Sequence, residues 1–213
     1  MDAEELVGRL HWLGHDSFRL DGPPVIYFDP WKLGRRPAPA DLVLVSHEHF
    51  DHCSPKDVQK VSGPDTVVIA AAPAAAELPN VRAVRPGDQL TVAGVELEAV
   101  PAYNTNKFRA PGVPFHPKGA EHVGYLVTME GARLYFAGDT DVIPEMADIA
   151  CDVALLPVSG TYVMTVEEAV EAARILRPQI VVPMHYGAGI GTPDDGRRFA
   201  ALYEGRAVVL EPE

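Results

Sequence analysis

The sequence is short of cysteine and of basic residues, and each shortage argues against a class of protein. It has 2 cysteines, Cys53 and Cys151, among 213 residues. Two are too few for a disulfide framework, so we expect free thiols in a cytoplasmic protein. The 18 Lys and Arg residues against 30 Asp and Glu give a formal net charge of -12. So acidic a chain repels phosphate backbones and anionic membranes, which argues against nucleic-acid and membrane partners.

The sequence also lacks the pattern of a membrane span or a secretion signal. Its longest apolar run, TVVIAAAPAAA at 66–76, is interrupted by Pro73 and is too short to cross a bilayer. The first ten residues, MDAEELVGRL, are acidic and lack the basic start and apolar core of a signal peptide. No linker or low-complexity tract divides the sequence, so we expect residues 1–213 to form a single domain.

Short apolar and β-branched runs bounded by turn residues predict many strands. They are expected at residues 10–14, 17–21, 25–28, 42–46, 66–70, 81–84, 89–100, 124–129, 133–138, 153–158, 180–184 and 207–211. The residues at 92–94 and 130–132 are typical of hairpin turns.

Fewer helices are predicted. Ser54 before Pro55 is typical of a helix N-terminus. Thr165 and Glu168 match a capping box, which opens a helix that ends before Pro178. Two more helices are expected near 73–78 and 194–204. Many strands with few helices indicate sheets covered by helices.

Polar residues follow four of the predicted strands directly. They are Asp29, His47, Asp139 and His185. In sheet proteins, ligands gather beyond the strand ends, where loops bring distant residues together. We therefore expect these four side chains to lie near one another.

The densest polar cluster contains His47, His49, Asp51 and His52. Alternate residues of an extended segment point to one side, so His47, His49 and Asp51 can converge while His52 faces a second point. Imidazole and carboxylate groups suit zinc, manganese or iron. The alternative is a solvated loop with scattered histidines, and this spacing makes such a coincidence rare.

The run SHEHFDH at 46–52 resembles the HxHxDH signature of the metallo-β-lactamase superfamily. FHPKG, YFAGDTD and VPMHYG follow in the family's order, and WLGHDSF and FDP resemble earlier family elements. The whole set is similar to a branch of small metal-dependent hydrolases that includes ascorbate-6-phosphate lactonase. The resemblance implies an α/β fold, an αβ/βα four-layer sandwich in which two central mixed β-sheets are flanked by helices.

The resemblance also implies a site for two divalent cations, zinc or else manganese, nickel or iron. The implied ligands are His47, His49 and His116 for one cation, Asp51, His52 and His185 for the other, and Asp139 as the bridge. The implied enzyme is a metal-dependent hydrolase whose bridging hydroxide cleaves an ester, lactone, phosphodiester or amide bond. Asp51 or Asp139 would take or relay the proton.

Further residues are open between a functional and a structural role. Asp29 could accept the free N–H of a ligand histidine or simply start a turn. His15 could lie beside the cations or cap a hairpin. His122 is the weaker alternative to His116, either as a substrate contact or as a surface residue. Tyr162 could donate a hydrogen bond to a developing oxyanion or be a packed aromatic.

Three basic residues flank the loop that leads to His116, and they could recognise an anionic small-molecule substrate or simply belong to a solvated loop. They are Lys107, Arg109 and Lys118. Between the expected ligands, Glu48 and Phe50 are interpreted as spacers that face away.

Two other enzyme classes use the same scaffold. A diiron oxygen reductase would carry Glu in place of His49 and would need a flavin domain, for which 213 residues leave no room. A nuclease of the ribonuclease Z type would need a protruding arm and a less acidic surface. A non-catalytic binding protein would not need the full ligand set.

Overall fold

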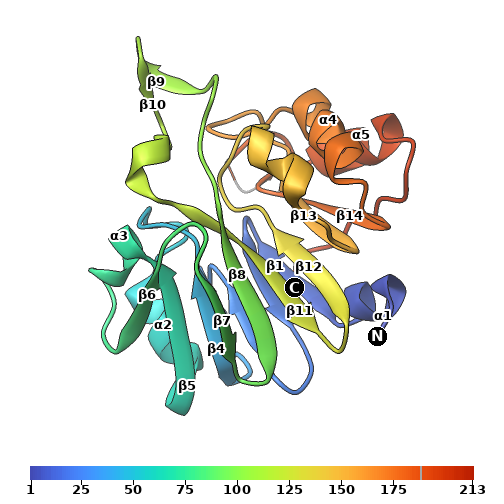
Figure 1. The fold of residues 1–213 in the computed structure, drawn as a ribbon. Coiled ribbons are helices and arrows are strands. Elements are labelled where there is room, and N and C mark those ends of the chain that lie inside the picture. The colour runs from blue at the N-terminus through green and yellow to red at the C-terminus, as the bar shows by residue number, and fades with distance from the viewer. Residues whose placement is uncertain (188) are drawn as a thin grey trace.

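Two six-stranded β-sheets form the centre of the computed structural model, which describes residues 1–187 and 189–213 (Figure 1). The first sheet contains β1 (Leu10–Gly14), β2 (Ser17–Leu20), β3 (Ile26–Phe28), β4 (Ala40–Val45), β5 (Ser62–Ala71) and β6 (Val81–Val84), in that order. The second has the order β14-β13-β12-β11-β8-β7. Its strands are β7 (Gln89–Val92), β8 (Val95–Pro101), β11 (Val123–Met129), β12 (Ala132–Phe136), β13 (Val153–Pro157) and β14 (Ile180–Met184).

Both sheets are mixed. In the first, β1, β2 and β3 pair antiparallel, and β3 to β6 pair parallel. In the second, β7, β8, β11 and β12 pair antiparallel, and β12, β13 and β14 pair parallel. A separate hairpin of β9 (Phe108–Ala110) and β10 (Val113–Pro114) projects from the loop between β8 and β11 (Figure 1).

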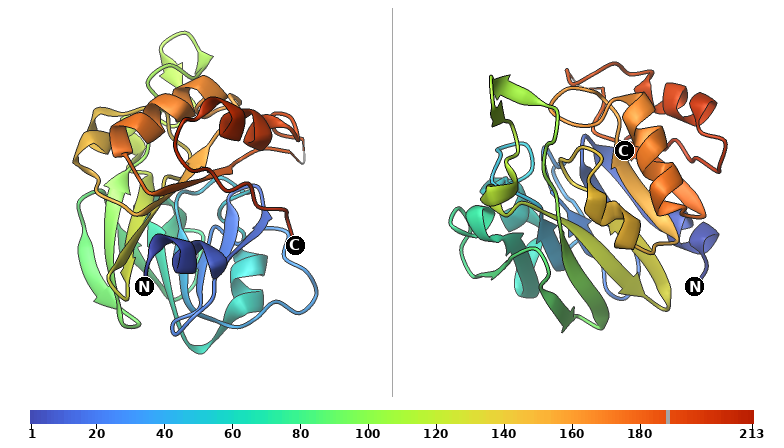
Figure 2. Two further views of the ribbon diagram at one scale, coloured as in Figure 1. Left: turned by 90° about the vertical axis from the view of Figure 1, so that its right-hand side faces the viewer. Right: turned by 45° about the horizontal axis from the view of Figure 1, so that its top comes forward.

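Helices cover the outer faces of the two sheets. α2 (Pro55–Val61) and α3 (Ala72–Ala75) pack on the first sheet, and α4 (Val166–Leu176) and α5 (Asp195–Leu202) pack on the second. α4 and α5, in orange and red, lie on the side of the molecule away from α2, in cyan (Figure 2). α1 (Ala3–Gly8) contacts β12 and β13, and two 3-10 turns, η1 (Lys118–Ala120) and η2 (Pro144–Asp148), complete the elements. This is the expected four-layer metallo-β-lactamase arrangement.

Alternation along β4 shows why its sequence is apolar from Leu42 to Val45. Leu42 and Leu44 lie in the main core between the sheets, whereas Val43 and Val45 lie in the smaller core beneath α2 and α3. Successive residues of a strand point to opposite faces, so a strand covered on both faces is a continuous apolar run.

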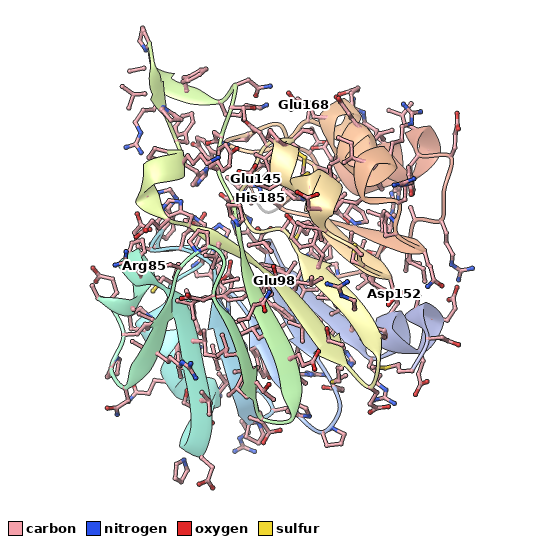
Figure 3. The ribbon with its side chains drawn as sticks, viewed as in Figure 1. Arg85, Glu98, Glu145, Asp152, Glu168 and His185 are labelled. Atoms are coloured by element: carbon pink, nitrogen blue, oxygen red, sulfur yellow. The ribbon has the colours of Figure 1, made fainter. Side chains whose placement is uncertain are left out.

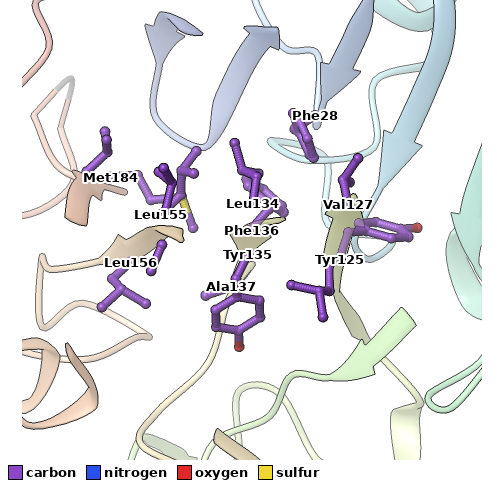
Figure 4. Packing of buried hydrophobic residues seen from close by; sticks show 14 of the residues in the cluster. Phe28, Tyr125, Val127, Leu134, Tyr135, Phe136, Ala137, Leu155, Leu156 and Met184 are labelled. Carbon is purple, nitrogen blue, oxygen red and sulfur yellow. The ribbon is translucent and has the colours of Figure 1, made fainter. Parts of the chain in front are cut away.

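The main core joins the two sheets directly. Phe28 of β3 lies across from Phe136 of β12, with ring centroids 5.1 Å apart (Figure 4). Two hydrogen bonds also cross between the sheets: the Tyr125 hydroxyl donates to the Val45 carbonyl at 2.7 Å, and the Val123 N–H donates to the Ser46 carbonyl at 3.1 Å. They hold β11 against the end of β4, where the polar cluster begins.

The capping chemistry expected from the sequence is present. The Thr165 side chain accepts from the Glu168 N–H, and the Glu168 carboxylate accepts from the Thr165 N–H, so the capping box at α4 is confirmed. Ser54 caps α2, whose first residue is Pro55. Both predicted hairpin turns are confirmed as well, between β7 and β8 and between β11 and β12.

Three features differ from the sequence-based expectation. The strand predicted at 207–211 is absent, and only Ala207 forms an isolated bridge, with Val181 of β14. The helix α1, capped by the Asp2 side chain, was not predicted, nor was the β9–β10 hairpin. These elements are short, so each carries only a weak sequence pattern. Among the described residues, no helix has the length and apolar character needed to cross a membrane.

Gly124 of β11 lies against the segment that leads to Asp139. A Cβ added there would lie 2.7 Å from the Phe136 oxygen and 2.8 Å from the Ala137 oxygen. We expect Gly124→Ala to lower the free energy of unfolding by about 1–3 kcal/mol, because the two backbones must separate. Urea unfolding measures this, with Gly119→Ala as the control, since a Cβ at Gly119 meets nothing within 4 Å. Equal effects of the two substitutions would contradict the prediction.

Candidate metal centre

The four polar residues that follow strand ends come together at one edge of the molecule. Asp29 and His47 follow the parallel strands β3 and β4, and Asp139 and His185 follow β12 and β14 of the other sheet. All four are buried. His185 lies in the interior between the two halves of the fold (Figure 3). Parallel strands place their carboxyl ends on the same side, which explains the convergence.

Three histidines form the first set of potential ligands. The Nδ1 of His49 lies 3.0 Å from the Nε2 of His47 and 3.2 Å from the Nε2 of His116. Ligand atoms around a tetrahedral zinc ion, bonded at about 2.0–2.1 Å, lie about 3.3 Å apart. The spacing of these nitrogens is therefore close to that of a tetrahedral cation site.

The two carboxylate oxygens of Asp139 face different histidines. One faces the first set of potential ligands, and the other faces a second set. Its Oδ2 lies 3.3 Å from the His116 Nε2 and 3.9 Å from the His47 Nε2. Its Oδ1 lies 3.5 Å from the His52 Nε2 and 3.4 Å from the His185 Nε2. A carboxylate placed in this way can contact two cations at once.

Oxygen atoms hold the opposite nitrogen of four of these rings. The Nδ1 atoms of His47 and His52 contact the Ser46 hydroxyl at 2.9 Å and the Asp29 carboxylate at 2.8 Å. For the other two rings, the Nδ1 of His116 is 3.0 Å from the Asn104 Oδ1, and that of His185 is 3.0 Å from the Ser159 hydroxyl. Such contacts orient the rings and leave Nε2 toward the centre of the site.

Asp29, which orients the His52 ring, is itself held by hydrogen bonds. Its Oδ1 accepts from the Ser46 N–H at 2.7 Å, and its Oδ2 accepts from the Ser46 hydroxyl at 2.5 Å. The residue has a positive φ of 39°, as do His15 at 54° and His185 at 57°. Non-glycine residues rarely adopt this region, and they cluster at functional sites where the surrounding structure holds them.

Several buried polar atoms of the site have no hydrogen-bond partner among the described residues. They include the His15 Nε2, the His52 Nε2, the Asp139 Oδ1 and both carboxylate oxygens of Asp16. Buried polar groups are normally paired, so these atoms indicate a place for an additional charged group. Imidazole nitrogen and carboxylate oxygen are the donors that zinc, manganese and iron accept, so the residues fit divalent cations.

The electrostatics of the site also favour a cation. Burial opposes a charge on the His52 ring, but the carboxylates of Asp139 and Asp29 outweigh it and raise the pKa of His52 to about 10. Burial would raise the pKa of Asp139, yet His185, His52 and their neighbours hold it well below its usual range. The position next to Asp139 therefore stabilises positive charge.

Comparison with known proteins identifies the family of the chain. The chain matches the family described as the Beta-lactamase superfamily domain over residues 9–185. A UPF0173 metal-dependent hydrolase of Methanoculleus marisnigri is 37% identical over 185 residues, which cover 84% of this chain and 80% of that protein. Another, of Thermoplasma acidophilum, is 31% identical over 91% of this chain and 90% of that protein. A metal-dependent hydrolase of Parabacteroides distasonis has a solved structure with a TM-score of 0.84 and 34% identity, covering 96% of this chain and 93% of that chain.

The chain belongs to the metallo-β-lactamase superfamily. Within it, the chain is a metal-dependent hydrolase of the UPF0173 family. A solved metallo hydrolase of Ignicoccus hospitalis, 24% identical with a TM-score of 0.77 over 95% of this chain and 94% of that chain, shows the same fold.

In this hydrolase, Asp51 lies beside the ligand cluster and Asp16 lies within it. The potential ligand atoms of Asp16, His52, Asp139 and His185 all lie within 4.8 Å of one another, whereas Asp51 is in no such group. The Asp51 Oδ2 instead lies 3.2 Å from the His15 Nε2. Burial would raise the pKa of Asp51, but His15 and His52 lower it to about 2, so the carboxylate is ionised at neutral pH.

His15 lies deep in the site. Its ring is 2% exposed, and the ring centroids of His15 and His185 are 4.3 Å apart. Its carbonyl accepts hydrogen bonds from the Trp12 indole and from the His185 N–H. Burial lowers the pKa of His15 to about 4, so the ring is neutral at neutral pH. Its ligand nitrogen also lies within 4.8 Å of those of His52 and His185, so the structure places His15 among the potential ligands and not at the surface.

His122 is buried near His47 but is in no ligand group. Its Nε2 lies 2.9 Å from the Glu48 Oε2, and this contact lowers the pKa of Glu48 to about 2. Of the two histidines considered from the sequence, His116 is the one that faces His49.

The interpretation of Phe50 as a spacer that faces away was wrong, because Phe50 is 76% exposed and lines the cavity at the site.

A cavity of about 260 Å³ opens onto the site. It is lined by His49, Phe50, Asp51, Phe115, His116, Asp139 and Tyr162. Tyr162 is 41% exposed, and its ring packs against Phe115 with centroids 4.6 Å apart. Its side chain therefore both packs and lines the cavity.

The basic residues near this loop lie outside the cavity lining. The Lys107 Nζ lies 2.7 Å from the Glu168 carboxylate, and the Lys118 Nζ lies 2.7 Å from the Glu145 carboxylate. The Arg109 guanidinium donates to the Phe115 carbonyl at 3.0 Å. Two of the three charges are thus compensated by acidic neighbours.

Sequence reasoning missed Asp16 and two of the residues that orient the rings, Ser46 and Ser159. Ser159 directly follows the apolar run VALLPV, so the strand-end pattern that identified Asp139 could have found it. Ser46 and Asp16 are adjacent in sequence to His47 and His15, and that proximity was their only signal.

We expect Asp29→Asn to weaken divalent cation binding by about 10–100-fold, because an amide cannot accept the His52 N–H and the bonds from Ser46 equally well. Competition with a chromophoric chelator measures the affinity. The control is Asp41→Asn, since Asp41 also accepts a backbone N–H in the same sheet but is exposed. Equal affinities for the two variants would show that Asp29 is structural only.

Proposed function

We propose that this protein hydrolyses an ester, lactone, phosphodiester or amide bond of a small molecule, using two divalent cations that share Asp139. The position of Asp139 is the observation that carries the proposal. Its two oxygens face separate groups of imidazoles, His47 and His116 on one side and His52 and His185 on the other.

The charge of the site supports two cations over one. Asp16, Asp29, Asp51 and Asp139 supply four carboxylates, and each lies within 4 Å of a histidine. Among the described residues, no lysine or arginine forms a salt bridge with any of them. Two divalent cations would balance four negative charges. Zinc is the first choice for three imidazoles in tetrahedral spacing, and manganese, nickel or iron are the alternatives.

Bound there, the cations would lower the pKa of a shared water and polarise the oxygen of the scissile group. The chain's own residues would do the rest. Asp139 holds the two halves of the site together. Asp51 is ionised and lines the cavity, so it can accept a hydrogen bond from the attacking water and relay its proton. Tyr162 lines the same cavity and can donate from its hydroxyl to a developing oxyanion.

The cavity supports a small substrate with an apolar portion. Phe50, Phe115 and Tyr162 supply aromatic surface beside Asp139, and no lysine or arginine is among the lining residues described above. This favours an uncharged ester, amide or lactone over a phosphodiester. The lactone fits the sequence resemblance to ascorbate-6-phosphate lactonase, although the cavity lining supplies no basic group for a phosphate.

A panel of substrates tests the function. Purified protein of known metal content is assayed against lactones, aryl and alkyl esters, amides and phosphodiesters, before and after chelation and after cation replacement. We expect hydrolysis of an uncharged carbonyl substrate that chelation abolishes and cation addition restores. Activity that is unchanged by complete removal of metal would overturn the proposal.

Asp139→Asn is expected to leave fewer than two cations bound and to lower turnover by at least about 100-fold, since loss of outer contacts alone costs 10–100-fold. An amide oxygen is a weaker ligand than a carboxylate, and an amide cannot bridge through two oxygens. Elemental analysis and steady-state kinetics measure the two effects. Asp148→Asn, at an exposed position in η2, is the control. Unchanged metal stoichiometry and rate would contradict the bridging role.

Replacing the Tyr162 hydroxyl separates catalysis from packing. We expect Tyr162→Phe to lower kcat about 100-fold with little change in KM, the lower end of the range for one oxyanion donor. Tyr162→Ala should raise KM as well, because the ring is lost. Tyr203→Phe, whose ring stacks on Phe199 away from the cavity, is the control. A Phe variant with the wild-type kcat would assign Tyr162 to packing alone.

A further inference from the structure

Asp16 lies in the tight turn between β1 and β2 and is fully buried. Its Oδ2 is 3.9 Å from the His52 Nδ1. The potential ligand atoms of Asp16, His52, Asp139 and His185 lie within 4.8 Å of one another. The turn thus places a carboxylate from the first sheet beside ligands from both sheets.

Buried aspartates elsewhere in this protein are held by backbone N–H groups. Those with such bonds are Asp29, Asp57, Asp141 and Asp195. Neither oxygen of Asp16 has a hydrogen-bond partner among the described residues, and Asp139 has one unpartnered oxygen, Oδ1. Asp16 therefore resembles the proposed bridging ligand and differs from the aspartates that stabilise turns.

A structural role does not account for this arrangement. A carboxylate that served the β1–β2 turn would accept hydrogen bonds from that turn, as Asp57 does from Lys32 and Leu33. Removing a carboxylate from water without a partner is costly, and a nearby cation compensates for that cost. Burial raises the pKa of Asp16 well above its usual range, so the ionised carboxylate needs an additional positive group beside it.

We propose that Asp16 is a carboxylate ligand of the cation that His52, Asp139 and His185 hold. The proposal rests on the two-cation site of the proposed function. It gives the second position two carboxylates and two imidazoles, whereas the first position has three imidazoles and one oxygen of Asp139. Carboxylate oxygen suits manganese better than imidazole does, so the second position should accept manganese more readily than the first.

Asp16→Asn tests the assignment by stepwise cation binding. Chelator competition with zinc and with manganese should show that the affinity for one of the two cations falls at least about 10–100-fold, which is the loss known for residues that only orient a ligand, while the affinity for the other changes little. Asp21→Asn is the matched control, since it removes one charge next to β2 but its side chain is 45% exposed. Two equivalents bound as in the wild type, or both weakened alike, would overturn the proposal.

Thermal unfolding provides a readout that does not depend on activity. After chelation, Asp16→Asn should unfold at a higher temperature than the wild type, because a buried unpaired carboxylate has been removed. After cations are added, its gain in unfolding temperature should be smaller. Asp16→Ser, which also removes the carboxylate, should show the same crossed pattern. A lower unfolding temperature in the chelated state for both variants would assign Asp16 to the fold and overturn its role as a ligand.

The outcomes for the wild type distinguish this proposal from the proposed function. Wild-type protein that binds two cations and hydrolyses a substrate, together with unaltered binding by Asp16→Asn, overturns only the role of Asp16. Wild-type protein that binds a single cation overturns the two-cation function and this inference with it.

Discussion

Negative charge buried without a basic partner is the constraint on which this protein's architecture depends. Asp16, Asp29 and Asp139 are removed from water at one edge of the two sheets, with Asp51 at the rim, and histidines are their only salt-bridge partners among the described residues. Burial raises the pKa of Asp16 and of Asp29, so their ionised forms are stabilised when positive charge is held close to them. The surrounding strands and loops hold imidazoles in place for that purpose.

Different parts of the fold supply the side chains of the site and hold them in place. The ends of parallel strands supply Asp29, His47, Asp139 and His185, and cross-sheet hydrogen bonds from β11 keep the two edges together. Hydroxyl, amide and carboxylate oxygens then fix the ring orientations. Aromatic side chains line the opening. Phe50, Phe115 and Tyr162 are not among the proposed cation ligands, so this aromatic part of the lining can vary without the loss of a ligand.

Much of the fold followed from local patterns. Both faces of β4 are buried, so its continuous apolar run was easy to recognise, and the capping box at Thr165 located α4. The short elements were harder. Ala207 makes one bridge to Val181 of the edge strand β14 where a full strand was expected, so the β-branched residues that follow it do not by themselves extend the pairing.

The candidate ligands could be named from the sequence for two reasons. His47, His49 and His52 are close together in the chain and form an unusual cluster. Asp139 and His185 come after predicted strands, where ligand-binding residues are common. The division of these ligands into two groups could not be predicted from the sequence. It depends on which oxygen of Asp139 faces which ring, and on a turn of the first sheet that brings Asp16 to residues of the second. Residue type and local spacing identify the chemistry, whereas the distances between atoms from separate strands arise only when the two sheets pack against each other.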